Sequence, residues 1–446
     1  MDLTALASDV LDQARQQGAT AGDLVIASGE SFSAGIRLGK VEKIQNSQEK
    51  RMGLRLFAGQ SSAITSTANF THAALQAFIT ETLALAKATA DDPFSGLPDQ
   101  SDLAQDVPDL DLTDTSVSLT LEEKLARAQE AEEAAFASDS RITNSEGAEF
   151  ANASREMVYA NSLGFCGSYH TTSFSLSVVP VASQAGGMQR DYWYSSQRKL
   201  RDLEAAKAVG QKAAERTVRR LGAKQVQTQE APVVFEPEMA ASLLRHLAGA
   251  ISGSALYRKT SFLLDKIGEK IAADGIFVED HARIPSALGS KPFDGEGLPT
   301  RQNIVVEDGG LTSYLLDTYS ARKLGLQSTG NASRSFADTP TASTTNFFLR
   351  PGTTPPEDII RSVRSGLYVT ELSGFGVNPV TGDYSRGAVG LWIEGGEIAY
   401  PVEEITIAGN LLDMFKNIEI IGNDLERRGT ISAPTVKIAR MTIAGT

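Results

Sequence analysis

The stretch EPEMAASLLRHLAGA, from Glu236 to Ala250, decides how the second half of this chain folds. Pro237 suits the first turn of a helix, where its missing N–H would have no partner, and Glu238 puts a negative charge at the positive end of the helix dipole. Apolar residues recur every three or four positions, at Met239, Leu243, Leu244, Leu247, Ala248 and Ile251. This spacing predicts a helix with one face in a core. The run Ala231–Glu236 before it predicts a strand.

The rest of the chain predicts an α+β protein. Helical spacing covers residues 3–17, 71–88, 121–136 and 203–221, and strand-like runs lie between them. We expect an N-terminal α+β domain (1–90), an acidic, Pro-rich linker (91–117), a central α+β domain (118–222) and, after a polar linker (222–230), a β-rich C-terminal domain (231–446). The first two units repeat the order helix, strands, helix, which suggests an internal duplication.

The last part of the chain, from Leu367 onward, is rich in strand-forming residues. Gly395–Gly396 separates two short apolar runs and predicts a tight hairpin. Two other glycine clusters, Gly325–Gly330 and Gly374–Gly376, lack the remaining residues of phosphate-binding or dinucleotide-binding loops, so we expect turns there.

Composition excludes several classes of protein. The 446 residues carry a net charge of −13 and 41% apolar side chains, which is typical of a globular protein and unlike a nucleic-acid binder. The basic run Lys212–Arg220 is interrupted by Glu215. No apolar run approaches the roughly 20 residues needed to cross a bilayer, and the N-terminus does not read as a signal peptide. We expect a cytoplasmic protein with no nucleic-acid or membrane partner.

Residues with catalytic potential are sparse. Cys166 is the one cysteine, and its neighbours favour a small packed side chain over a nucleophile. The four histidines, His72, His170, His246 and His281, are scattered, so a zinc site would need long-range assembly. His246 lies beside the apolar stripe, which favours a core histidine. No serine has the Gly-x-Ser-x-Gly setting of a hydrolase nucleophile.

The C-terminal sequence resembles the TldD/PmbA family, bacterial proteins often labelled modulators of DNA gyrase. The resemblance is densest at Gly376, Asn378–Pro379, Thr381–Gly382, Ser385, Gly387, Gly390, Trp392–Ile393, Gly396 and Pro401–Val402. In the TldD branch the helix described above carries His-Glu-x-x-x-His, which supplies zinc ligands and a catalytic glutamate. Those positions fall here on Arg245, His246 and Ala250.

These replacements indicate the PmbA branch, also called TldE. Arg245 has no lone pair to offer a metal, and Ala250 has no ligand atom. The cysteine found near the end of TldD-type chains has no counterpart here. The resemblance therefore implies a subunit with no catalytic or metal-binding residues of its own, and zinc only in a TldD-like partner.

Three functions stay open from the sequence. The first is the non-metal subunit of a TldD/TldE-type metallopeptidase that degrades or processes unfolded peptides. The second is a homodimeric peptide-binding or regulatory protein without catalysis, and the third is an independent peptidase with an unrecognised site. The Gly- and Thr-rich strands could bind peptides by strand addition or could be paired within their own sheet, and the sequence names no peptide-binding residues.

Overall fold

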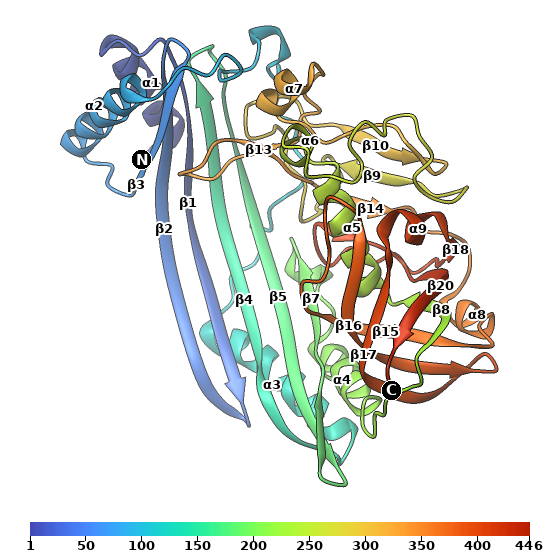
Figure 1. Ribbon diagram of the computed structural model, residues 1–446. Coiled ribbons are helices and arrows are strands. Elements are labelled where there is room, and N and C mark those ends of the chain that lie inside the picture. The colour runs from blue at the N-terminus through green and yellow to red at the C-terminus, as the bar shows by residue number, and fades with distance from the viewer.

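The computed structural model describes residues 1–446 as a long curved sheet with a β-rich C-terminal unit packed against it (Figure 1). The first half contains α1 (Leu3–Gln16), β1 (Ala21–Arg37), β2 (Lys40–Ala58), β3 (Ser61–Thr67), α2 (His72–Ala88), a 3₁₀ turn (Gln100–Asp102), α3 (Leu121–Ser138), β4 (Ile142–Asn161), β5 (Cys166–Gln184), β6 (Gly187–Arg190), β7 (Trp193–Gln197), a second 3₁₀ turn (Leu200–Asp202) and α4 (Ala206–Val218).

The second half contains more, shorter elements. They are β8 (Gln229–Phe235), α5 (Pro237–Ala250), α6 (Gly253–Tyr257), β9 (Val278–His281), β10 (Gln302–Glu307), β11 (Gly310–Leu311), α7 (Thr318–Leu324), β12 (Ala332–Ser333), β13 (Thr341–Ala342), β14 (Phe347–Leu349), α8 (Pro356–Arg361), β15 (Ser365–Ser373), β16 (Asp383–Glu394), β17 (Glu397–Asn410), α9 (Leu411–Lys416), β18 (Ile418–Ile421), β19 (Ile431–Ser432) and β20 (Val436–Ala444). The predicted α+β class is confirmed.

Four strands of 17 to 20 residues dominate the first sheet, whose order is β3-β2-β1-β4-β5-β6, with β7 also on β5. The β1–β2 hairpin turns at Leu38–Gly39, where both residues have positive φ. The carboxylate of Glu132, on α3, accepts the backbone N–H groups of both turn residues, so the hairpin tip is tied to a helix.

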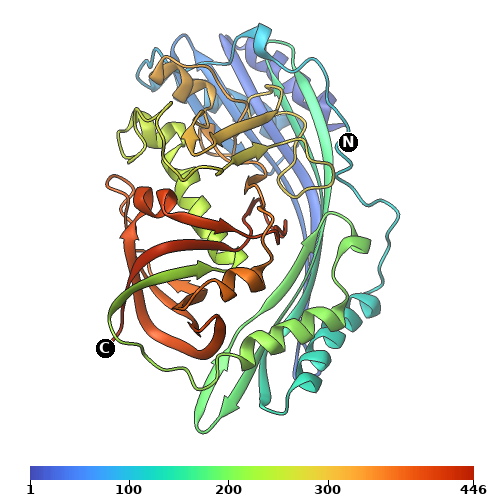
Figure 2. The ribbon, with the colours of Figure 1, turned by 90° about the vertical axis from the view of Figure 1, so that its right-hand side faces the viewer.

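Two pairs of helices cover opposite ends of these strands (Figures 1 and 2). Apolar residues of α1 and α2 form one core with the sheet, and those of α3 and α4 form another. The pairing of β1 with β4 joins the strands of the two predicted units in one sheet. Residues 91–117 run along this assembly and are partly anchored, because Leu97, Leu103, Leu110 and Leu112 are buried. The domain boundaries and the duplication stay predictions.

A buried ion cluster joins the sheet to the C-terminal unit. Asp23, on β1, is fully buried and accepts hydrogen bonds from Arg55 Nε at 3.0 Å and Tyr159 Oη at 3.1 Å. Arg334 of the C-terminal unit lies 2.5 Å from the same carboxylate. The two guanidinium groups outweigh burial and lower the pKa of Asp23, so the cluster stays ionised and holds the two halves together.

The C-terminal unit surrounds the largest core. Strands β17, β16, β15, β8 and β20 pair in that order, and β17 also pairs with β20, which closes a ring. A second sheet has the order β11-β10-β9-β14-β19. The buried face of α5 contributes Leu243, Leu244 and Leu247 to this core, as its spacing predicts. The predicted hairpin at Gly395–Gly396 is confirmed, with both glycines at positive φ.

The structure bears on two further expectations, one about Cys166 and one about membrane-spanning segments. Cys166 is exposed at the start of β5, so the prediction of a packed side chain is wrong. Partial burial still raises the pKa of its thiol, which disfavours the reactive thiolate. No helix combines the length and the apolar character needed to span a membrane.

Candidate functional site

A cleft of about 480 Å³ lies along the polar face of α5. Its walls come from three parts of the chain: α5 itself, the β7 region of the first sheet, and the C-terminal strands with the segment before β20. The lining residues are Tyr192, Tyr194, Pro237, Glu238, Met239, Ala241, Ser242, Arg245, His246, Leu372, Arg386, Glu426, Arg428, Gly429, Thr430, Ile431, Ser432 and Ala433.

Two of the three positions that align with the zinc-binding motif line this cleft, and the third does not. Arg245 is exposed on its wall and forms no ion pair. His246 lines the same wall. Ala250 is only 3% exposed and packs in the C-terminal core, away from the cleft.

His246 differs from the predicted core histidine. Its ring is half-buried and packs edge-on against Tyr384, with 6.0 Å between ring centroids, and it makes no hydrogen bond within the chain. Burial, together with the positive charges of Arg386 and Arg245, lowers the pKa of His246. The imidazole is therefore neutral at neutral pH.

The N-terminus of α5 is fixed by buried ion pairs with α4. The Glu236 carboxylate, immediately before the helix, accepts hydrogen bonds from Arg216 at 2.8 and 3.1 Å and from Arg219 at 3.1 Å. Asp191 lies 3.4 Å from Arg216 and 3.8 Å from Arg220. The basic run that ends at Arg220 thus faces carboxylates inside the protein, and it orients the helix that lines the cleft.

Glu238 adds an acidic group in the first turn of the helix. Neither of its carboxylate oxygens has a hydrogen-bond partner, and the closest cation is Arg216 at 3.7 Å. Burial raises the pKa of Glu238 despite this neighbour.

Across the cleft, the guanidinium of Arg428 lies 3.5 Å from the ring centre of Trp193, so the central and C-terminal regions meet at this wall.

The remaining histidines lie elsewhere. His170 Nε2 is 3.7 Å from Glu156 on the neighbouring strand, and His281 Nδ1 accepts the backbone N–H of Arg283. No three His, Cys, Asp or Glu side chains are grouped so that they could hold a metal ion. The glycine clusters form turns: Gly325 ends α7 in the left-handed conformation, and Gly330 and Gly374 also have positive φ.

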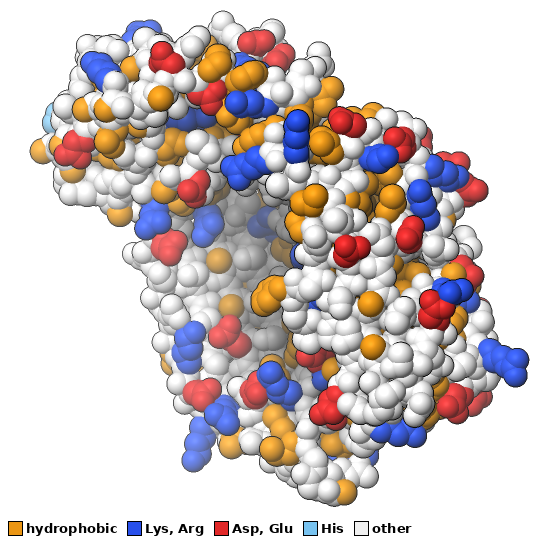
Figure 3. Space-filling view, viewed as in Figure 1, with side chains coloured by type: hydrophobic (Ala, Val, Ile, Leu, Met, Phe, Trp, Pro, Cys, Tyr) orange, Lys and Arg blue, Asp and Glu red, His pale blue; other side chains and the backbone are white.

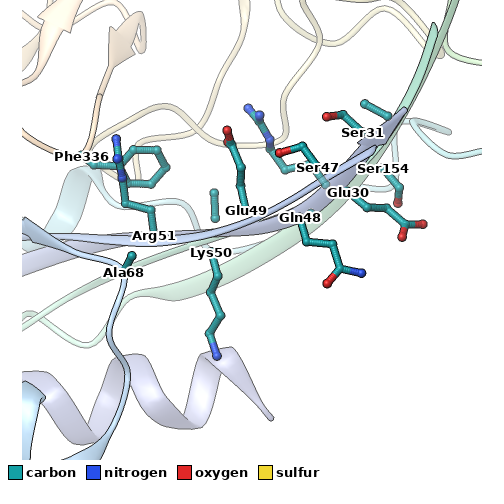
Figure 4. Close-up of a pocket in the computed structure, with 14 residues that line it drawn as sticks. Glu30, Ser31, Ser47, Gln48, Glu49, Lys50, Arg51, Ala68, Ser154 and Phe336 are labelled. Atoms are coloured by element: carbon teal, nitrogen blue, oxygen red, sulfur yellow. The ribbon is translucent and has the colours of Figure 1, made fainter. Parts of the chain in front are cut away.

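A second pocket, of about 300 Å³, lies over the middle of the long sheet. Figure 4 shows Glu49 and Arg51 projecting to the side of β2 on which Phe336 lies, whereas Gln48 and Lys50 project to the opposite side. Figure 3 shows the molecule hollowed between this sheet and the C-terminal unit. Most of its lining residues are polar or charged, among them Glu30, Glu49 and Arg155.

Sequence reasoning missed most residues of the α5 cleft. Arg386, Arg428 and the stacked pair Tyr192–Tyr194 come from strands and loops far from α5 in the sequence. One usable pattern existed: Glu238, Ser242 and Arg245 recur at helical spacing opposite the apolar stripe, so they share the face that borders the cleft.

Comparisons with known proteins agree with this architecture. Family models of the PmbA/TldA metallopeptidases match residues 22–86 (domain 1), 114–221 (central domain) and 228–445 (C-terminal domain). The metalloprotease PmbA of Escherichia coli O157:H7 is 39% identical over 423 residues, which cover 95% of this chain and 92% of that protein. The PmbA homolog of Haemophilus influenzae is 36% identical over 445 residues, which cover 100% and 96%.

Solved structures show the same fold. A Bacteroides thetaiotaomicron protein described as a candidate modulator of DNA gyrase matches with a TM-score of 0.93 at 30% identity, and the match covers 100% of both chains. TldE from Thermococcus kodakarensis matches with a TM-score of 0.89 at 20% identity, over 99% of this chain and 100% of that one, which is a likeness of fold. The chain therefore belongs to the PmbA/TldD metallopeptidase family.

Proposed function

We propose that this chain is the subunit without a zinc site in a PmbA/TldD-type peptidase complex. A TldD-like partner supplies the metal and the catalytic glutamate, and the complex degrades or processes unfolded peptides. The observation that carries the proposal is the identity of the residues on α5 at the motif positions.

The donor set on α5 does not fit zinc. Zinc in proteins is held by nitrogen, sulfur and oxygen donors, usually three or four of them. Arg245 is a permanent cation, Ala250 has no donor and packs in the core, and His246 is the one donor left at these positions. The two neighbouring guanidinium groups also disfavour a further positive ion beside His246. We therefore assign the metalloprotease activity in the names of the relatives to the complex and not to this chain alone.

An open strand edge supports assembly with a partner. Beyond β1, strand β2 pairs with β3 only over Met52–Ala58, so residues 40–51 have no second neighbouring strand. Val41 and Ile44 on this stretch, and Leu38 in the turn before it, expose about half of their surface among mostly polar and charged neighbours. A long strand edge without a neighbour leaves backbone N–H and C=O groups free to pair with another chain. Such an edge fits a partner subunit, and it would equally fit a second copy in the homodimeric alternative.

A second open edge supports peptide binding. β19 is the edge strand of its sheet and lines the α5 cleft. The N–H of Phe347 donates to the carbonyl oxygen of Thr430, so the backbone groups of the next residue, Ile431, point away from β14. An extended peptide could pair with them by strand addition, which reads the main chain and suits unfolded substrates.

Reconstitution tests the proposal. Cleavage of fluorescein-labelled, unfolded casein is measured for this chain, for a TldD-like subunit and for their mixture, with and without a chelator. We expect cleavage by the mixture that the chelator abolishes, and none by this chain alone. Chelator-resistant cleavage by this chain alone would favour the independent peptidase. An inactive mixture, together with binding of casein by a homodimer of this chain, would favour the regulatory alternative.

A variant pair tests the role of the β2 edge. Ile44→Lys places a charge on the exposed edge and should reduce both complex formation and cleavage by the mixture. Gln327→Lys adds the same charge at an exposed, polar position outside this edge and serves as the control. Equal complex formation by the two variants, measured by light scattering after gel filtration, would argue against this edge as the contact.

A further inference from the structure

Two arginines at one end of the α5 cleft have no carboxylate partner. Arg245 forms no ion pair or hydrogen bond, and Arg386 uses only its Nε, which donates to the carbonyl oxygen of Ser373 at 3.0 Å. The terminal nitrogens of Arg386 are therefore available, and so is the whole guanidinium of Arg245.

Other arginines around the cleft are paired. Arg216 binds Glu236, Arg220 lies 2.6 Å from Glu371, and Arg428 contacts Glu426. The contrast matters because this chain has an excess of carboxylates, with 55 acidic against 42 basic side chains. Two unpaired guanidinium groups lining one cavity in such a protein mark a place where an anion from outside is expected.

The fold brings these two arginines together from distant elements. Arg245 lies on α5, and Arg386 lies on β16 two residues after Tyr384, so both β16 side chains point to the same side of the strand. Tyr384 is buried and packs edge-on against His246, which anchors the wall between the two guanidinium groups. After burial, the positive charges of Arg386 and Arg245 also lower the pKa of His246, so both guanidinium groups lie near this ring.

We propose that this end of the cleft binds a carboxylate group carried by an extended peptide, held by the guanidinium groups of Arg245 and Arg386. Arginine is suited to this role because its planar fork can donate two parallel hydrogen bonds to one carboxylate. The carboxylate is either the C-terminal group of the peptide or an Asp or Glu side chain. That the ligand is a peptide rests on the proposed function, and that it carries a carboxylate rests on the two arginines.

The rest of the cleft fits the chain that would precede this group. Glu238 lies seven residues before Arg245, about 10 Å along the helix, and its ion-pair partner is Arg216 rather than either of the two arginines. Tyr192 and Tyr194 stack with 6.1 Å between ring centroids and offer an apolar wall between these two ends. The open edge of β19 borders the same space.

Binding to this chain alone, measured by fluorescence anisotropy, tests the proposal apart from any catalysis. Three hexapeptides of Gly, Ala and Ser carry an uncharged BODIPY label at the N-terminus. The first ends in a free carboxylate, the second in an amide, and the third in an amide but with one internal Glu. We expect the amide peptide without Glu to bind about tenfold or more weakly than whichever of the other two carries the preferred carboxylate.

Variants assign the effect to the two arginines. Arg245→Gln and Arg386→Gln should each weaken binding of the carboxylate peptide about tenfold and leave binding of the amide peptide unchanged. Arg364→Gln removes an exposed arginine outside the cleft and should change neither. Because Arg245 is exposed, its variant should fold like the natural chain, which circular dichroism checks.

Equal binding of all three peptides would overturn the proposal, and so would binding by Arg245→Gln or Arg386→Gln that matches the Arg364→Gln control. Neither result depends on a TldD-like partner, so failure here is separate from failure of the reconstituted cleavage.

Discussion

Replacing Glu236 by Gln should destabilise the α4–α5 region by about 3 kcal/mol. Glu236 is 3% exposed, and its carboxylate accepts three hydrogen bonds from Arg216 and Arg219. Removing one partner of a buried ion pair costs roughly 3–5 kcal/mol, because the remaining charge is left in a medium that solvates it poorly. Arg216 keeps Asp191 at 3.4 Å and Glu238 at 3.7 Å, which places the expected loss at the lower end.

Hydrogen exchange, measured by mass spectrometry, reports the local stability of α4 and α5 directly. A loss of about 3 kcal/mol raises the exchange of α4 and α5 amides that open together by roughly a hundredfold. Glu230→Gln is the matched control, because Glu230 pairs with Arg440 at the surface, where an ion pair contributes about 0–1 kcal/mol. Equal exchange of α5 in the two variants would refute the claim that this network holds the cleft-lining helix.

Four further outcomes concern Glu296 and the residues at the motif positions. Burial and Asp294 raise the pKa of Glu296 to about 7, so between its unfolded pKa and pH 7 the folded state holds a proton that the unfolded state lacks, and stability falls as pH rises from 5 to 8. Glu296→Gln should remove this loss of stability, which is at most about 3 kcal/mol. The control Glu307→Gln, at an exposed position, should keep the loss. Urea unfolding of both variants at pH 5 and pH 8 measures the difference. The effect of pH on stability through His246 has the opposite sign, because its lowered pKa means that the unfolded state binds more protons below about pH 6.5. NMR titration should give a pKa for folded His246 below that value. His246→Gln should reduce the loss of stability on acidification. Ala250→His should cost roughly 1–3 kcal/mol by overpacking the core, and the triple variant Arg245→His, His246→Glu, Ala250→His should not cleave peptides alone; zinc-dependent cleavage by it would show that only the ligands had been lost.

Local patterns predicted the elements well. The apolar spacing from Met239 to Ile251 and Pro237 at the first turn identified α5, and paired glycines identified the β16–β17 hairpin. Each of these features depends on residues within a few positions of one another, so one sequence contains the whole pattern.

Long-range contacts were beyond such reasoning. The run that contains Arg216, Arg219 and Arg220 reads as a weak basic patch, but its partners Glu236, Asp191 and Glu371 come from a following strand end, a loop and a distant strand. The cleft has the same character, because Arg386 reaches α5 only once the C-terminal ring has closed. The exposure of Cys166 likewise depends on where β5 lies in the sheet rather than on its neighbours in the chain.

The zinc content of the isolated chain tests the central claim most directly. The protein is purified without a histidine tag, dialysed against zinc-free buffer and analysed for metal beside a TldD-like subunit treated in the same way. The donor set of Arg245, His246 and Ala250 predicts well under one zinc per chain here and about one in the TldD-like subunit. One zinc per chain that survives dialysis and disappears in His246→Ala would contradict the account.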